Sequence, residues 1–151
     1  MPTLLVVHHT PSPATQAVLE AVVEGIGLAE GVDCVLRPAL SAGAADLLAA
    51  DGVLLGTPAN IGYMSGALKH FFDTVYYPCL EATQGRPFAA YVHGNLDSGG
   101  AVRAIEAITT GLQWRAVAPV LTVTGAPDRA ARDAVYELAA TLAATISSGS
   151  G

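Results

Sequence analysis

Short runs of hydrophobic residues alternate along the chain with longer segments in which hydrophobic residues recur at helical spacing. Each short run is apolar at consecutive positions, which is typical of a strand that is covered on both faces. The predicted strands are residues 3–8, 32–36, 52–56, 87–93 and 117–123.

Helical periodicity fills the segments between these strands. The clearest stripe consists of Met64, Ala67, Leu68, Phe71, Phe72 and Val75. The first helix carries Val18, Leu19, Val22, Val23 and Ile26 on one face, and Gly25, Gly27 and Gly31 are expected to cap its end. Further helices are predicted at residues 41–50 and 100–112, and Pro127 is placed in the first turn of the last one.

Five β-α units with short links predict an α/β fold with a doubly wound parallel sheet and helices on both faces. We expect one domain, residues 1–146, followed by a flexible tail of Ser and Gly at residues 147–151. Ligands of such sheets bind beyond the carboxyl ends of the strands, where the winding direction reverses. The loops after the first, third and fourth strands are therefore the candidates for a site.

Composition excludes several other classes. The net charge is −6 and the seven basic residues are scattered, which argues against a nucleic-acid surface. No apolar run approaches the roughly 18 residues of a membrane span, so no membrane insertion is expected. The first residues contain no basic leader, which favours a cytoplasmic protein. Cys34 and Cys79 are too few and too far apart for a disulfide framework or a zinc site and are expected to be free thiols.

The first candidate loop is rich in hydroxyl groups. Thr10, Ser12 and Thr15 lie within six residues, directly before and within the first turn of the first helix. A helix N-terminus offers unpaired N–H groups and a partial positive charge, so this loop could hold a phosphate without Lys or Arg. The alternative is ordinary capping of the helix by Ser12.

The other two candidate loops are rich in small and turn-forming residues. Residues 56–66 contain Gly, Pro and Asn, which let the backbone approach a flat ligand, although a plain loop with tight turns would use the same residues. Residues 93–100 combine glycines with a helix start that Asp97 or Ser98 could cap.

Together the three loops resemble the flavodoxin-like superfamily of FMN-binding proteins. The segment Thr10-Pro11-Ser12-Pro13-Ala14-Thr15 matches its phosphate pattern. The stretch from Gly56-Thr57-Pro58 through Gly62-Tyr63-Met64, followed by Lys69, Phe71, Phe72 and Asp73, is similar to NAD(P)H-dependent FMN reductases and flavodoxin-fold quinone reductases. The resemblance covers the whole chain in the order of elements, and it implies strand order 2-1-3-4-5.

The resemblance also implies a set of cofactor-binding residues. Thr10, Ser12, Ala14 and Thr15 would hold the FMN phosphate. The isoalloxazine ring would be lined by Pro58, Ala59, Asn60, Ile61, Gly62 and Tyr63, with His93, Gly94 and Asn95 on its other side. Pro13 stands where many members have Gly, which stiffens the phosphate loop and removes one backbone donor. The third loop has no Tyr or Trp to cover the flavin, which indicates an open flavin face.

The remaining candidates carry weaker signals. His8 and His9 are adjacent on a strand and point to opposite faces, so they are not expected to share a metal ion, and no metal site is predicted. His9 is a candidate for contact with the flavin or its phosphate. We expect Trp114 to pack at a helix end.

By this resemblance the protein is an oxidoreductase in which FMN takes a hydride from NADH or NADPH and passes electrons to a quinone, a free flavin or another small acceptor. No catalytic side chain is then required. Two alternatives stay open: a flavodoxin-type electron carrier that docks a redox partner, and a flavodoxin-like domain that has lost its flavin. The resemblance also implies a homo-oligomer.

Overall fold

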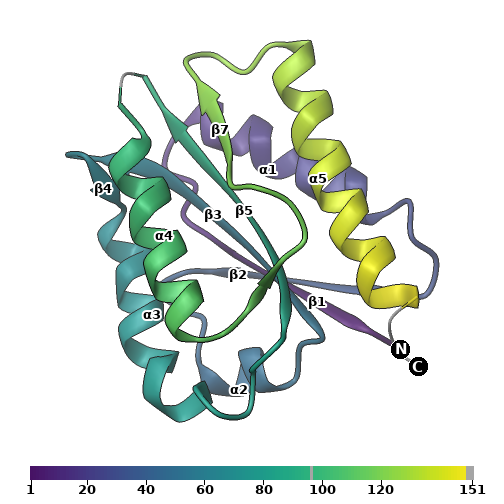
Figure 1. Cartoon of the computed structure of the whole chain (residues 1–151). Coiled ribbons are helices and arrows are strands. Elements are labelled where there is room, and N and C mark those ends of the chain that lie inside the picture. The colour runs from purple at the N-terminus through teal and green to yellow at the C-terminus, as the bar shows by residue number, and fades with distance from the viewer. Residues whose placement is uncertain (96, 149–151) are drawn as a thin grey trace.

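A computed structural model describes residues 1–95 and 97–148. It shows a parallel sheet between two layers of helices (Figure 1). The principal strands are β1 (Thr3–His8), β2 (Asp33–Pro38), β3 (Gly52–Asn60), β5 (Pro87–Gly94) and β6 (Arg115–Ala116), in the order β2-β1-β3-β5-β6. Two short strands complete the sheet, β7 (Leu121–Thr124) parallel to β5 and β4 (Tyr63–Met64) antiparallel to β3. β6 lies directly before the predicted fifth strand, 117–123, and β7 overlaps its second half. Both pair in parallel with β5, so the order 2-1-3-4-5 is confirmed.

Helices cover both faces of the sheet. Helices α1 (Pro13–Ile26) and α5 (Arg129–Ser148) lie on one face, while α2 (Ala44–Leu48), α3 (Gly66–Cys79) and α4 (Gly99–Gly111) lie on the other. The alternation of side chains along β1 divides the core accordingly. Leu4 and Val6 pack with α1 and α5, whereas Leu5 and Val7 pack with the opposite layer. The predicted doubly wound α/β architecture is therefore confirmed.

Strand β3 is longer than predicted, since it continues from Gly52 through Pro58 to Asn60. The proline is tolerated because of where β1 ends. His9 donates its N–H to the oxygen of Gly56 at 3.0 Å, so the even-numbered residues of β3 direct their backbone groups toward β1. β1 ends opposite Gly56, and the missing N–H of Pro58 therefore removes no ladder hydrogen bond.

Strand β2 is an edge strand and is not covered on both faces as the pattern suggested. It begins and ends later than predicted, at Asp33 and Pro38, and every residue except Val35 is exposed. β1 is its partner on the inner side. An edge position accepts charged residues and proline, which explains why the strand extends to include Arg37 and Pro38.

Two further elements differ from the prediction. The fifth predicted strand, 117–123, is extended only from Leu121 onward, and a segment that contains Pro119 separates this part, β7, from β6 at Arg115–Ala116. Proline has no N–H to donate to a ladder, which accounts for the break. The helix predicted at residues 41–50 forms only between Ala44 and Leu48, where Asp46 accepts a hydrogen bond from the Gly43 amide at 3.0 Å.

The predicted helix ends are also corrected. Gly25 lies inside α1, where a side chain would overlap the carbonyl oxygen of Tyr136 on α5, and Val23 is 39% exposed instead of buried. Pro127 lies before α5 and not in its first turn. The helix is capped by the following residue, Asp128, which accepts from the Ala131 amide at 2.8 Å. Helix α5 continues through Ser148, so the predicted tail begins too early, and its residues 149–151 lie outside the described residues.

No helix in the described part of the chain combines the length and hydropathy that a membrane-spanning segment requires.

Candidate functional site

The three candidate loops gather at one edge of the sheet. Strands β1, β3 and β5 are neighbours, and their carboxyl ends are in register, with His8 opposite Gly56 and Pro58 opposite His93. The loops that follow these strands therefore emerge side by side. This is the location predicted for a ligand of a doubly wound sheet.

The first loop forms a complete capping arrangement at the start of α1. The Ser12 hydroxyl accepts from the Thr15 amide at 3.2 Å, and the Thr15 hydroxyl accepts from the Ser12 amide at 3.1 Å. The two hydroxyl oxygens are 2.9 Å apart. Pro13 has no N–H, and the Thr15 amide donates to the Ser12 hydroxyl. The amide of Ala14 is therefore the N–H of the first turn that the cap does not use. The capping role and the predicted phosphate role thus fall on the same two hydroxyl groups.

The second loop is a tight hairpin between β3 and β4. Asn60 lies opposite Tyr63, and the two central residues have positive φ angles, 49° for Ile61 and 73° for Gly62. Positive φ at both positions is the geometry of a type I′ turn. A β-branched residue in this region is strained, and the Ile61 side chain is fully exposed. Ile61 therefore adopts an unfavourable backbone conformation although its side chain gains no burial.

Two buried hydroxyl groups fix this hairpin to the fold. The Thr57 hydroxyl donates to the oxygen of Pro58 at 2.8 Å and accepts from the Ser65 amide at 3.0 Å. The Ser65 hydroxyl in turn caps α3 by accepting from the Leu68 amide at 3.2 Å. Sequence reasoning missed both positioning residues. The available signal was Ser65 directly before a clear helical stripe, which is a typical N-cap position.

The third loop packs directly against this hairpin. A side chain at Gly100 in α4 would overlap the carbonyl oxygen of Gly62, and a side chain at Gly94 would lie 3.3 Å from the Cβ atom of Ala59. The α4 N-terminus is capped by Asp97, which accepts from the Gly99 amide at 2.9 Å. Of the two predicted caps, Ser98 occupies the N-cap position but makes no side-chain capping bond within the described residues, and the preceding Asp97 supplies the bond to the first turn instead.

The imidazole of His93 connects the third loop to a fourth one. His93 is buried, its Nε2 atom lies 2.7 Å from the oxygen of Gly125, and the Gly125 amide donates to the oxygen of Gly94 at 3.0 Å. The ring therefore ties the end of β5 to the turn after β7. The predicted contact of His93 with a flavin stays a prediction.

Two buried polar atoms near this edge have no hydrogen-bond partner in the part of the chain that the structure describes, the His9 Nδ1 atom and the Tyr91 hydroxyl. Tyr91 lies opposite Gly56, and its ring occupies the space that a side chain there would need. Burial raises the pKa of Tyr91 well above its ordinary value. Burial, together with the neighbouring His9, lowers the pKa of His8, whose Nδ1 atom lies 2.8 Å from the Thr10 hydroxyl.

The predicted ring-binding residues are presented to solvent to different degrees. Pro58 is buried and Ala59 is half-buried, whereas the rest of the hairpin segment is exposed: Asn60, Ile61, Gly62 and Tyr63. Asn95 is exposed on the neighbouring loop. The structure thus brings the predicted residues together at one open edge.

Trp114 packs between Phe72 and Phe88 and donates to the Thr83 hydroxyl at 2.9 Å, so its predicted packing role is confirmed.

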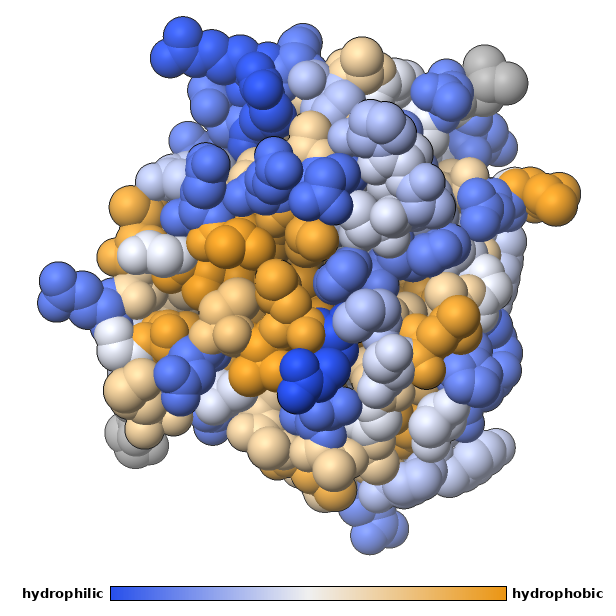
Figure 2. Space-filling view, turned by 180° about the vertical axis from the view of Figure 1, so that it is seen from behind, coloured by the Kyte–Doolittle hydropathy of each residue, from blue (hydrophilic) through white to orange (hydrophobic). Residues whose placement is uncertain are grey.

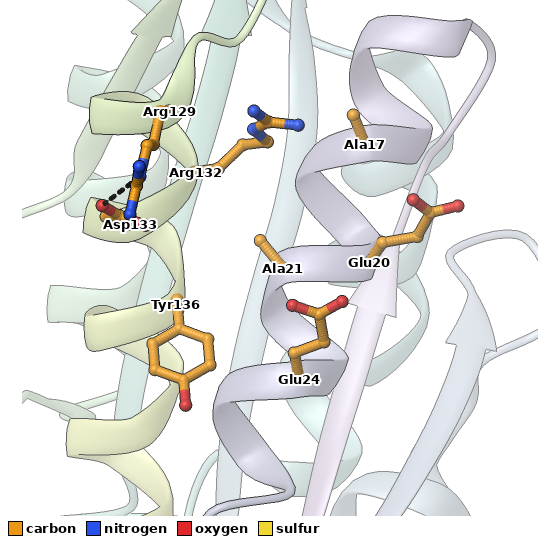
Figure 3. Close-up of a pocket in the computed structure, with 8 residues that line it drawn as sticks. All are labelled: Ala17, Glu20, Ala21, Glu24, Arg129, Arg132, Asp133 and Tyr136. Carbon is orange, nitrogen blue, oxygen red and sulfur yellow. Dashed lines mark ion pairs between the residues drawn. The ribbon is translucent and has the colours of Figure 1, made fainter.

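A separate hollow of about 300 Å³ lies between α1 and α5. Figure 3 shows Glu20 and Glu24 on α1 and the two arginines Arg129 and Arg132 on α5. Arg129 pairs with Asp133 on its own helix at 4.0 Å. The hollow is lined only by helix surface residues and includes none of the three loops, so we do not place the candidate site there.

The sequence matches the family of NADPH-dependent FMN reductases over residues 19–147. The match begins inside α1, so the hydroxyl-rich first loop precedes it. A flavodoxin of Aquifex aeolicus (strain VF5) is 32% identical over 112 residues, which make up 74% of this chain and 60% of that protein. This chain therefore spans less than two thirds of the length of that relative.

Solved structures show the same fold. A flavodoxin from the domain Archaea superimposes with a TM-score of 0.82 at 20% identity, over 96% of this chain and 99% of that one. A WrbA-like flavodoxin from Agrobacterium tumefaciens has a TM-score of 0.80 at 18% identity, over 98% and 99% of the two chains. These likenesses show the flavodoxin fold. Because the family match covers most of the chain, the protein belongs to the family of NADPH-dependent FMN reductases.

Proposed function

We propose that this protein binds FMN at the carboxyl edge of the sheet and acts as an oxidoreductase. NADH or NADPH would supply the electrons, and a quinone, a free flavin or another small molecule would accept them. The family membership supports the use of FMN, and the name of the family supports NADPH as a donor. The proposed site rests on the residues of this chain.

The observation that carries the proposal is the position of two features at the same edge. A hydroxyl-capped helix N-terminus, at Ser12 and Thr15, follows β1, and a strained hairpin turn, at Ile61 and Gly62, follows the neighbouring strand β3. The first can bind a phosphate and the second offers backbone groups to a flat ring. FMN contains both parts in one molecule.

The phosphate would be held by the first loop. A hydroxyl group can accept one hydrogen bond and donate another at the same time. Ser12 can therefore keep the Thr15 amide and turn its O–H from the Thr15 oxygen, 2.9 Å away, to a phosphate oxygen. The Ala14 amide and the partial positive charge of α1 add to this. The Nδ1 atom of His9, which has no partner among the described residues, is a further candidate donor beside the same loop.

The ring would lie between the hairpin and the third loop. Pro58 to Tyr63 would contact one side of it, and Gly94 and Asn95 would approach from the other. FMN, when bound, accepts a hydride and passes the electrons on, so the protein needs only to bind and orient it. Thr57 and Ser65 would keep the hairpin in place through their buried hydrogen bonds. The exposed hairpin leaves one face open for a small acceptor.

A second candidate function is electron transfer between proteins without oxidation of NAD(P)H. The relative from Aquifex aeolicus is named a flavodoxin, and the net charge of −6 fits a docking surface for a basic partner. The exposed hairpin suits either function. The two candidates differ in whether a reduced nicotinamide can deliver its hydride to the flavin.

Anaerobic stopped-flow mixing separates them. The FMN-loaded protein is mixed with NADPH and, separately, with NADH, and the visible absorption band of the flavin is followed. We expect bleaching with at least one nucleotide at a rate that saturates with its concentration. If neither nucleotide reduces the flavin while dithionite does so in separate one-electron stages, the reductase function is wrong and the carrier function stands.

A further inference from the structure

We propose that the outer edge of β2 is a dimer interface, at which a second copy of this chain adds its own β2 in antiparallel orientation. The inference does not depend on flavin binding. It rests on the direction of the outward-facing backbone groups of β2, on the charges along the strand and on the apolar surface beside it.

The backbone of β2 is correctly phased for such pairing. The amide of Asp33 donates to the oxygen of Pro2 at 2.8 Å, and the amide of Ala39 donates to that of His8 at 2.7 Å. The odd-numbered residues therefore direct their backbone groups toward β1. Because neighbouring residues of a strand point their backbone groups to opposite sides, Cys34 and Leu36 direct theirs outward, where no strand of the described residues lies.

One antiparallel register satisfies both the hydrogen bonds and the charges. When Cys34 lies opposite the partner's Leu36, these two residues form hydrogen-bonded pairs and Val35 faces the partner's Val35. In the same register Asp33 lies directly opposite the partner's Arg37, and the symmetry of the dimer produces this pair twice. Opposite charges in directly facing positions stabilise a sheet.

The neighbouring registers lack this complementarity. If Cys34 faced the partner's Cys34, Asp33 would lie opposite Val35. If Leu36 faced the partner's Leu36, Arg37 would lie opposite Val35. The pattern of charges on β2 thus selects a single closed pairing between two copies.

An apolar surface lies beside the same strand. Leu36 is 37% exposed and Val23 is 39% exposed, and together with Leu19 they form the apolar part of a groove of about 290 Å³ between β2 and α1. Its rim on α1 is polar, with Gln16, Glu20 and Glu24. Figure 1 draws β2 behind the other strands, and Figure 2, seen from behind, shows hydrophobic side chains gathered near the middle of that face. A second copy placed on β2 would bring its own Leu36 to this groove and shield the surface from water.

The existing contacts of Arg37 are compatible with the dimer. Its Nε atom lies 3.4 Å from Asp46, its Nη1 atom donates to the oxygen of Leu36 at 3.1 Å, and the side chain is 44% exposed. Pairing would replace the bond to Leu36 by one from the amide of the partner's Cys34. A guanidinium group has five N–H donors, so Arg37 can keep Asp46 and still meet the partner's Asp33.

Charge reversal tests the interface. Sedimentation equilibrium of the purified protein, with and without FMN, is expected to show a dimer in both cases. Asp33→Arg and Arg37→Asp should each weaken dimerisation by about tenfold or more, because two attractive pairs become repulsive. The double variant should restore it. Glu106→Arg, an equal change of charge on the exposed surface of α4, is the control and should leave the dimer intact.

A disulfide tests the register. In a Cys34→Ser background, Val35→Cys should form an interchain disulfide under mild oxidation, because facing Cα atoms of a non-hydrogen-bonded pair lie about 4.5 Å apart. Cys34 of the wild type should not do so, since its symmetry mate would be a diagonal neighbour about 7–8 Å away. A monomer at all concentrations would overturn the proposal. So would a dimer whose dissociation constant is unchanged by the charge reversals. Crosslinking of the wild type through Cys34, with none in the Val35→Cys variant, would overturn it as well. Loss of FMN binding would leave it unaffected.

Discussion

The carbonyl oxygen of Gly62 occupies the space that a side chain at Gly100 would need. The turn of the β3–β4 hairpin and the first turn of α4 are therefore in direct backbone contact. This contact joins the second and third loops of the proposed flavin site, so the position of one loop sets the position of the other.

Gly100→Ala should disturb this contact and weaken FMN binding. The added methyl group forces the hairpin or α4 to move, and overpacking of this kind destabilises by about 1–3 kcal/mol. We expect FMN to bind about tenfold or more weakly, as measured by isothermal titration calorimetry. Gly66→Ala is the matched control, because the position of its added side chain at the start of α3 has no described atom within 4 Å apart from its chain neighbours and the nearby backbone of α3 itself. Equal affinities of the two variants for FMN would contradict a role of this contact in flavin binding.

Ile61→Asn should stabilise the fold. Ile61 adopts a φ of 49° with a fully exposed side chain, so the substitution relieves strain without losing buried surface. Asn-Gly is a preferred pair for a type I′ turn, and we expect a gain of about 1 kcal/mol in the free energy of unfolding. Urea denaturation measures it. Leu40→Asn changes a comparable exposed residue, 67% exposed and without positive φ, and should alter stability by less than about 0.5 kcal/mol.

Replacing Ser12 and Thr15 together by Ala should weaken FMN binding by about 1–3 kcal/mol, because two hydrogen bonds to a charged phosphate are lost. The double variant should also lose about 1 kcal/mol of stability, since both side chains cap α1. Asp128→Ala removes the cap of α5 and separates the two effects. That control should lose similar stability with no change in the FMN dissociation constant. A double variant that binds FMN as tightly as the wild type would remove the phosphate from this loop.

Tyr91→Phe should stabilise the protein and change its response to alkaline pH. The Tyr91 hydroxyl is buried without a partner among the described residues, so its removal should add about 1 kcal/mol to the free energy of unfolding. The pKa of Tyr91 is raised in the folded state, while in the unfolded chain it lies near about 10. Above that pH the unfolded state loses a proton that the folded state keeps, so stability falls as the pH rises.

The wild type should therefore lose up to about 1.4 kcal/mol per pH unit more than Tyr91→Phe above a pH of about 10. Denaturation of both proteins at several alkaline pH values measures the difference. Stability curves that run parallel through this range would show that Tyr91 ionises equally in both states.

The elements and their order could be predicted from the sequence because each strand and helix has its own hydrophobic period. Their ends could not. The third strand is predicted to end at Gly56, yet β3 continues through Pro58, because β1 has already ended on the side where the proline's N–H would be needed. In the same way, Arg37 and Pro38 extend β2 because it lies at the edge of the sheet, which is a tertiary property.

In the candidate site, too, some features could be predicted from the sequence and others depend on the tertiary structure. The hydroxyl groups of Ser12 and Thr15 could be selected by residue type and spacing, whereas Ile61 and Gly62 are implied by the resemblance to FMN-binding proteins. The interactions that position them could not be predicted, because they join distant segments. The hydrogen bond from the Ser65 amide to Thr57 and the bond between His93 and Gly125 depend on which strands lie side by side.

Amide hydrogen exchange with and without FMN tests the account most directly, because it reports both binding and its place. We predict that FMN slows exchange in peptides that cover residues 9–16, 57–65 and 93–95, while peptides from the middle of α5 change little. Unchanged exchange in the three loops, or protection confined to the hollow between α1 and α5, would contradict an FMN site at the carboxyl edge of the sheet.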